Sequence, residues 1–129
     1  MSNITENMDL VTQHIIMSKD LNAHGNLFGG IILAWVDEAA ALYTMEKISY
    51  TNIVTVNIDD VNFRSPGRNG DLVQIYAAIE KFGSSSLTVR TVALSNNSVT
   101  KEKREIINCK VRFVCLDEKG KPFGFFKKK

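Results

Sequence analysis

The most apolar stretch of the chain is followed by four segments in which apolar and polar residues alternate. Residues 31–48 contain good helix formers, no Gly or Pro, and apolar residues on nearly every side up to Tyr43, so they predict a buried helix. The β-branched run 11–17 predicts a strand before this helix. Alternation of period two predicts four strands after it, over residues 52–63, 72–82, 87–94 and 105–116.

The phase of each alternation predicts which side chains face the core. Within residues 52–63, Val54, Val56 and Ile58 share one phase, and the phase changes at Asp59, so we expect a β-bulge there. In the three later strands the predicted core residues are Val73, Ile75, Ala77, Ile79, Leu87, Val89, Thr91, Ala93, Ile107, Cys109, Val111, Phe113 and Cys115.

One strand, one long helix and four strands with short connections predict an α+β fold, with an antiparallel β-sheet curled around a single helix. A sheet covers a helix on one side only. The other side of a helix this apolar needs a partner, and a second copy of the chain is the simplest one.

Length and composition agree with one globular unit. The 129 residues fit one domain over residues 1–129, and 44% hydrophobic with 23% charged residues is ordinary for a globular protein. The net charge of +2 is too mild to indicate a nucleic-acid partner. No apolar run approaches the roughly 20 residues that a bilayer requires, so no membrane partner is expected.

The cysteines and the N-terminus indicate a cytoplasmic location. Cys109 and Cys115 lie six residues apart in one predicted strand, roughly 20 Å from each other, and cannot form a disulfide. The first residues lack the cationic start and apolar run of a signal peptide.

Several common signatures are absent. Gly25 and Gly30 have the spacing of a phosphate-binding loop, but Ile31 stands in place of its Lys. The sequence has no HExxH, CxxC or GxSxG motif, and His14 and His24 are its only histidines, so we expect no metal site.

Gly29 and Gly30 lie where the connection becomes helix. Their backbone N–H groups have no helical partner, and a ligand could approach them without side-chain obstruction. Such a helix N-terminus favours negative charge, including the oxyanion formed when a carbonyl is attacked. The alternative is that the glycines only make a tight turn.

Two acidic residues interrupt the apolar helix. The helical neighbours of Asp37 are Leu33, Ala34, Ala40 and Ala41, and Glu38 has similar surroundings. Because an unpaired carboxylate is costly on an apolar surface, we expect at least one of the two to be functional or paired. The alternative is a structural carboxylate that caps a loop or pairs with an Arg across an interface.

Three stretches together resemble the hotdog-fold acyl-CoA thioesterases. They are HGNLFGGIILAWVDEAA from His24 to Ala40, FRSPGRNGD from Phe63 to Asp71, and CKVRFVCLDEKGKP from Cys109 to Pro122. The most similar branch contains the cytosolic long-chain acyl-CoA hydrolases and their single-domain bacterial relatives. FGG replaces the HGG of many members.

The resemblance implies hydrolysis of a fatty acyl-CoA to a free fatty acid and coenzyme A. It implies that the Gly29 and Gly30 amides polarise the thioester carbonyl, that Asp37 is general base or nucleophile, and that Asn26 holds the water or the carbonyl. Glu38 is then a neighbour. No cofactor is expected, because coenzyme A is part of the substrate and product.

The spacing of these residues favours a site shared by two chains. Asp37 lies seven residues beyond Gly30, roughly 10 Å along the helix axis. Two helices packed antiparallel would bring the glycine end of one toward Asp37 of the other. We therefore expect a homodimer with Asn26 from one chain and Asp37 from its partner, as the resemblance also implies; related enzymes often form hexamers, as trimers of dimers.

Coenzyme A carries phosphates that need cationic and N–H partners. Arg64 and Arg68 are the candidates, with Gly83, Ser84 and Ser85 of the GSSS turn. The alternatives are that Arg64 pairs with a carboxylate and that GSSS is only a hairpin turn. Lys127–Lys129 are expected to be a solvated tail.

Three other functions compete with the thioesterase interpretation. A non-catalytic acyl-CoA sensor on the same fold would not need both Asn26 and Asp37. A hydratase or dehydratase of similar fold would need a His in a different motif from those of His14 and His24. A purely structural oligomerisation domain would leave the acidic residues of the helix without a role.

Overall fold

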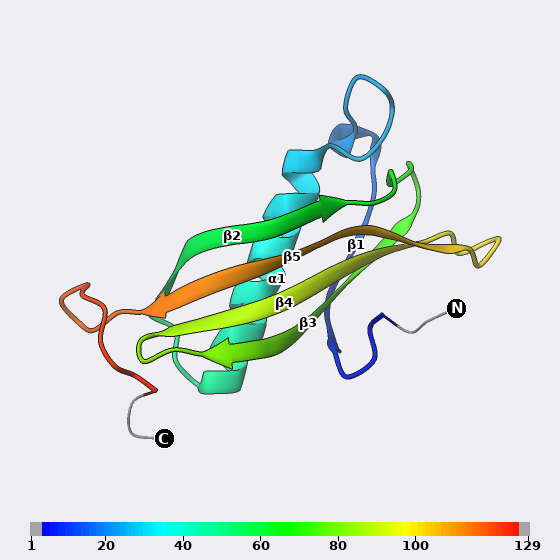
Figure 1. Cartoon of the computed structure of the whole chain (residues 1–129). Coiled ribbons are helices and arrows are strands. Elements are labelled where there is room, and N and C mark those ends of the chain that lie inside the picture. The colour runs from blue at the N-terminus through cyan, green and yellow to red at the C-terminus, as the bar shows by residue number, and fades with distance from the viewer. Residues whose placement is uncertain (1–3, 127–129) are drawn as a thin grey trace.

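The computed structural model describes residues 4–126, which form one antiparallel sheet and one long helix (Figure 1). The strands are β1 (Asp9–Ile15), β2 (Ile53–Phe63), β3 (Leu72–Phe82), β4 (Ser86–Asn96) and β5 (Lys103–Cys115). The helices are the 3₁₀ turn η1 (Ser18–Asp20) and α1 (Gly29–Ile48).

All five strands lie in a single sheet of order β1-β3-β4-β5-β2, and every pairing is antiparallel. Helix α1 crosses one face of this sheet, which we call the inner face (Figure 1). This arrangement confirms the predicted α+β class and the hotdog architecture, an antiparallel sheet around one long helix.

The core lies between α1 and the inner face. On β3, β4 and β5 the predicted alternation is confirmed, since the expected core residues are all buried except Ile79, which packs partly buried against them. The helix contributes the buried residues Ile32, Val36, Ala39, Ala40, Tyr43 and Thr44.

Strand β2 departs from the predicted phase. The bulge expected at Asp59 is present, between Asp59 and Asn62, and Asp60 has a φ of 54°. A second irregularity lies between Thr55 and Asn57, which the sequence pattern does not reveal. As a result Thr55 stands opposite the core residue Phe113.

The prediction that Val54 and Val56 share an inward phase with Ile58 is therefore wrong. The two valines are 41% and 51% exposed, whereas Ile58 packs against the core. The extra residue between Thr55 and Asn57 shifts the phase of the strand, so the valines before Ile58 no longer share its face.

The remaining boundaries differ slightly from those predicted. Strand β1 begins two residues earlier, at Asp9, and does not include Met17. Helix α1 begins at Gly29, with Phe28 as its N-cap residue. Strand β4 extends to Asn96, where an Asn97 side chain that accepts hydrogen bonds from two backbone N–H groups forms the turn into β5.

The outer edge of β2 and the outward face of α1 are open surfaces of the described fold. Strand β2 is an edge strand of eleven residues, and its exposed apolar side chains include Val54, Val56, Val61 and Phe63. The face of α1 that points away from the sheet includes Ala34, Glu38 and Leu42, which are exposed.

Three further expectations concern the cysteines, a membrane span and the C-terminal lysines. Cys109 and Cys115 are both free thiols, as predicted. Among residues 4–126, no helix combines the length and apolar character needed to cross a membrane. The predicted tail Lys127–Lys129 lies outside the described residues.

Candidate active site

The segment before α1 is fixed by backbone pairing to the loop that follows β2. The side-chain oxygen of Asn22 accepts hydrogen bonds from the backbone N–H groups of His24 and Asn26, at 2.9 and 3.1 Å. Asn26 forms an isolated antiparallel bridge with Arg68, and the Leu27 N–H donates to the Gly67 carbonyl at 2.8 Å. Asn26 is thereby placed beside the loop, and its side-chain amide makes no hydrogen bond within residues 4–126.

Gly29 and Gly30 differ in how closely an aromatic ring approaches them. Neither has a positive φ, so a turn conformation does not require them. A Cβ on Gly29 would lie 3.5 Å from the Phe63 ring, and one on Gly30 would lie 3.0 Å from the Phe28 ring. A side chain at Gly30 would therefore crowd the Phe28 ring, whereas at Gly29 it would make ordinary contact, and the first N–H groups of α1 have no helical partner.

A hollow of about 320 Å³ lies beside the start of α1. It is bounded by the helix start, the end of β2 and the following loop. Its walls include Asn26, Gly29, Phe63, Arg64 and Pro66. Unpaired helix N–H groups, a free amide and a cation at one hollow suit a polar, partly anionic ligand.

Arg64 and Arg68 lie on the same loop, and both are exposed. Their backbones are bound, since the Arg64 N–H donates to the Ile106 carbonyl at 2.7 Å. Neither guanidinium forms an ion pair within residues 4–126. Both cations therefore remain available to a ligand.

A buried carboxylate anchors this loop. Asp71 is 4% exposed, and its Oδ2 accepts hydrogen bonds from the Ser95 hydroxyl at 2.7 Å and the Arg68 N–H at 3.3 Å. Arg104 lies 3.7 Å from the same oxygen. The position of Arg68, and through it that of Asn26, depends on Asp71.

A second buried acidic residue, Asp20 of η1, lies in the segment that leads to the glycine pair. Asp20 accepts a hydrogen bond from the Met17 N–H at 3.0 Å, which, with the Lys19 ammonium, lowers the pKa of Asp20 below its usual value. Its carbonyl accepts the N–H of Phe28 at 2.9 Å. The residue that precedes the glycine pair is therefore tied to η1.

Asp37 lies outside this hollow, farther along α1. It is half-buried, and its Oδ1 accepts a hydrogen bond from the Thr55 hydroxyl at 2.8 Å. No ion pair within residues 4–126 involves Asp37. Glu38, by contrast, is exposed on the outward face of α1.

The turn Gly83–Ser85 lies at the opposite end of the sheet from Asn26. It joins β3 to β4 near the C-terminal end of α1 (Figure 1). The Ser85 carbonyl accepts the Cys115 N–H, and the Ser84 carbonyl accepts the Phe126 N–H. A single chain therefore brings together Asn26, Gly29, Gly30, Arg64 and Arg68, but neither Asp37 nor the serine turn.

Cys109 is a buried thiol of β5 whose pKa is shifted toward the protonated form. Burial raises the pKa of its thiol, the Thr91 hydroxyl opposes that shift, and the negative charge of Asp37 reinforces it. A neutral buried thiol is a poor nucleophile. Cys109 therefore belongs to the core.

The two histidines take no part in this constellation. His14 stacks on Trp35 with ring centroids 4.2 Å apart, and His24 is exposed in the loop. Within residues 4–126, no group of three His, Cys, Asp or Glu side chains has the geometry of a metal site.

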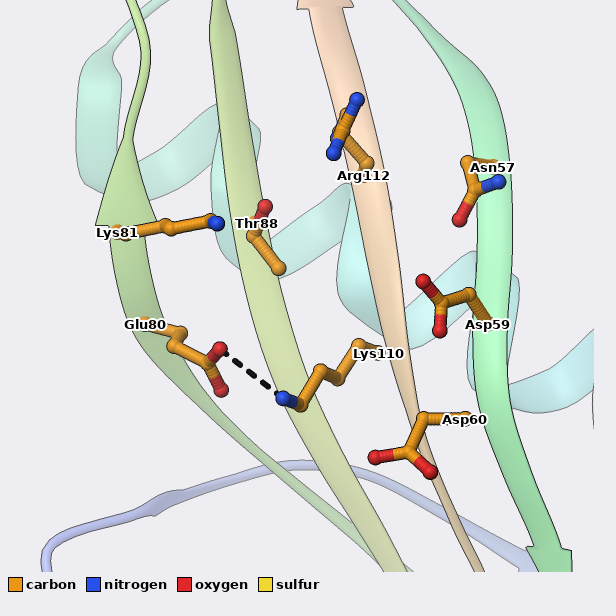
Figure 2. Close-up of a pocket in the computed structure, with 8 residues that line it drawn as sticks. All are labelled: Asn57, Asp59, Asp60, Glu80, Lys81, Thr88, Lys110 and Arg112. Carbon is orange, nitrogen blue, oxygen red and sulfur yellow. Dashed lines mark ion pairs between the residues drawn. The ribbon is translucent and has the colours of Figure 1, made fainter.

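A second hollow, on the outer face of the sheet, is lined by opposite charges (Figure 2). Glu80 and Lys110 form an ion pair at 3.2 Å across it. Its charged residues are Asp59, Asp60, Glu80, Lys81, Lys110 and Arg112. Because the sheet separates it from α1, it contributes nothing to the groups around Asn26 and Asp37.

The sequence pattern does not single out three of these residues. The irregularity in β2 changes the phase of the strand, so the sequence does not predict that Thr55 faces inward. In the sequence, Phe28 resembles any apolar residue and Asp71 resembles any polar loop residue. A polar residue among strand valines is the only signal that points to Thr55.

Comparison with known proteins shows relatives of similar length. A model of the Thioesterase superfamily matches residues 24–102. An acyl-CoA thioester hydrolase of Buchnera aphidicola, itself uncharacterized, is 32% identical over 117 residues, which cover 88% of this chain and 85% of that protein. The acyl-CoA thioester hydrolase YciA of Escherichia coli is 27% identical, with 88% of both chains covered.

Solved structures resemble the whole fold. A hexameric thioesterase from Yersinia pestis superposes with a TM-score of 0.84 at 31% identity, covering 92% of this chain and 95% of that one. An acyl-CoA hydrolase from Staphylococcus aureus, in complex with butyryl coenzyme A and coenzyme A, superposes with a TM-score of 0.81 at 28% identity, covering 94% and 73%.

Proposed function

The chain belongs to the thioesterase superfamily, and on that premise we propose that it hydrolyses fatty acyl-CoA to a free fatty acid and coenzyme A. The relatives named acyl-CoA thioester hydrolases match nearly its whole length, which supports this substrate class. The observation that carries the proposal is the pairing of an open helix N-terminus at Gly29 and Gly30 with a carboxylate, Asp37, on the same apolar helix.

The reaction assigns a role to each group. Asp37 takes a proton from a water molecule as the water oxygen attacks the thioester carbonyl carbon. The Gly29 and Gly30 N–H groups stabilise the negative charge on the carbonyl oxygen, and Asn26 orients the water or the carbonyl. When the C–S bond breaks, the thiolate of coenzyme A takes up the proton and the fatty acid leaves. A version in which Asp37 attacks first, forming an anhydride that water hydrolyses, uses the same groups.

The site is shared between two protomers. Antiparallel pairing of two β2 edges over their full length sets Ile53 opposite Phe63 of the partner subunit and Thr55 opposite Val61 of the partner subunit. Asp37 accepts a hydrogen bond from Thr55 and therefore approaches the end of the partner's β2. That end leads into the partner's Arg64. The exposed valines of this edge favour such pairing.

The same two-fold arrangement supports the coenzyme A subsites. Within one chain, the Gly83–Ser85 turn and the start of β2 lie at the same end of the sheet. The Cys115 N–H donates a hydrogen bond to the Ser85 carbonyl, and the Leu116 N–H donates to the Asn52 carbonyl. Across the dimer, that end faces the partner's loop with Arg64 and Arg68. Ser84 and Ser85 of one chain and the two arginines of the other then bind the phosphates.

The hexameric relatives support the higher assembly, and the cysteine chemistry supports the location. The dimer is the minimal unit, and a hexamer built of three dimers corresponds to the hexameric thioesterase of Yersinia pestis. The free cysteines are in keeping with the cytoplasm. The chain works as one domain, without metal or cofactor, since water and the acyl-CoA supply every atom of the reaction.

Thiol release from acyl-CoA tests the function. The purified protein is mixed with acyl-CoA substrates of increasing chain length and a chromogenic thiol reagent. We expect release by the wild type and a loss of at least about 100-fold for Asp37→Asn, which removes the proton acceptor. Absence of release across all chain lengths would refute hydrolysis and favour a non-catalytic acyl-CoA sensor.

A further inference from the structure

Thr55 is the single donor that the described chain offers to the Asp37 carboxylate. Its hydroxyl lies 2.8 Å from Oδ1, whereas no hydrogen bond or ion pair within residues 4–126 reaches Oδ2. A threonine hydroxyl can donate one hydrogen bond, and an ionised carboxylate only accepts. One oxygen of Asp37 is therefore held, and the other is left open.

The backbone of β2 is arranged to deliver this hydroxyl. Ile53, Ile58 and Phe63, which stand opposite core residues of β5, are the apolar members of the inner face, and Thr55 is a polar member. The irregularity between Thr55 and Asn57 lets both Thr55 and Ile58 face inward, although their spacing would otherwise put them on opposite faces.

Packing does not explain this placement. Thr55 is exposed and is not part of the apolar core. A β-branched apolar residue would suit a strand at least as well, because valine has the same shape and a high strand preference. The feature that distinguishes threonine from valine here is the hydroxyl, and its hydrogen bond partner is Asp37.

We infer that Thr55 is a positioning residue for Asp37: its hydroxyl fixes Oδ1, so that Oδ2 points to the reacting water. The inference rests on the proposed hydrolysis. Asp37 lies on an apolar helix face, and no cation of residues 4–126 pairs with it, so its side chain would otherwise sample several rotamers. Misplacement of a reacting group by about 1 Å can lower a rate about 100-fold.

Three variants separate the effect of the Thr55 hydroxyl from the effect of its side-chain volume. Thr55→Val keeps the volume and removes the donor, Thr55→Ser keeps the donor, and Thr51→Val is the matched control, an exposed threonine just before β2 whose side chain makes no hydrogen bond within residues 4–126. We expect Thr55→Val to lower kcat about 10- to 100-fold with KM nearly unchanged. Thr55→Ser is expected to restore most of kcat, and Thr51→Val to match the wild type.

Two measurements keep the outcomes distinct. Thermal unfolding and the oligomeric state of Thr55→Val should match the wild type, since the residue lies outside the core. A wild-type kcat in Thr55→Val, or an equal loss in Thr55→Ser, overturns the role of the hydroxyl while Asp37→Asn stays inactive. If the wild type releases no thiol, or Asp37→Asn keeps full activity, the proposed function itself fails.

Discussion

At the scale of single residues, neighbouring carboxylates on α1 have different surroundings. Asp37 is half-buried and bonded to Thr55, whereas Glu38 is exposed on the outward face of the helix. A carboxylate oriented by one donor, with its second oxygen open, can accept a proton from water. An exposed carboxylate without a fixed partner has no comparable preorganisation.

Arg64 provides a residue-scale prediction. Its guanidinium is exposed at the Asn26 hollow without an ion pair in the described chain, so it can bind a phosphate of coenzyme A. Arg64→Ala should raise KM for acyl-CoA about tenfold, the loss of one charge-assisted contact, with little change in kcat. Steady-state kinetics measure both constants, and Arg112→Ala on the outer face is the matched control. Equal KM values in the two variants would show that Arg64 does not bind coenzyme A.

At the scale of elements, the alternation of β3, β4 and β5 could be read from the sequence because each strand keeps one phase over its core residues. Strand β2 could not, because two irregularities change its phase within eleven residues. A local pattern reveals the change at Asp59, where the apolar positions shift. It misses the one near Thr55, because exposed valines at an open edge resemble core valines.

The Asp71 anchor provides an element-scale prediction. Asp71→Ala leaves the buried Ser95 hydroxyl and the Arg68 N–H without their acceptor, which costs about 1–3 kcal/mol of unfolding free energy. The loop should also lose its fixed position, so KM for acyl-CoA rises. Urea unfolding measures the first effect, and Asp59→Ala, at an exposed carboxylate of β2, is the control. An Asp71→Ala variant as stable as that control would contradict the anchor.

At the scale of the whole molecule, the proposed active site needs residues from two chains. Asn26, Gly29 and Arg64 line one hollow, and Asp37 and Ser84 lie away from it. The helical spacing of Gly30 and Asp37 already predicts this separation, because distance along a helix follows from residue count. The edge that would join the two halves could not be read from the sequence, since it depends on the strand order that places β2 at the edge of the sheet, paired on one side only.

Subunit mixing tests the shared site most directly. Asn26→Ala and Asp37→Ala are each expected to be inactive, because each removes one group from both sites of a dimer. When equal amounts are unfolded and refolded together, half of the dimers are mixed, and each mixed dimer holds one intact site. The account predicts recovery of about one quarter of the wild-type thiol release. No recovery, with mixed dimers demonstrated by differently tagged chains, would show that Asn26 and Asp37 act within one chain and would contradict it.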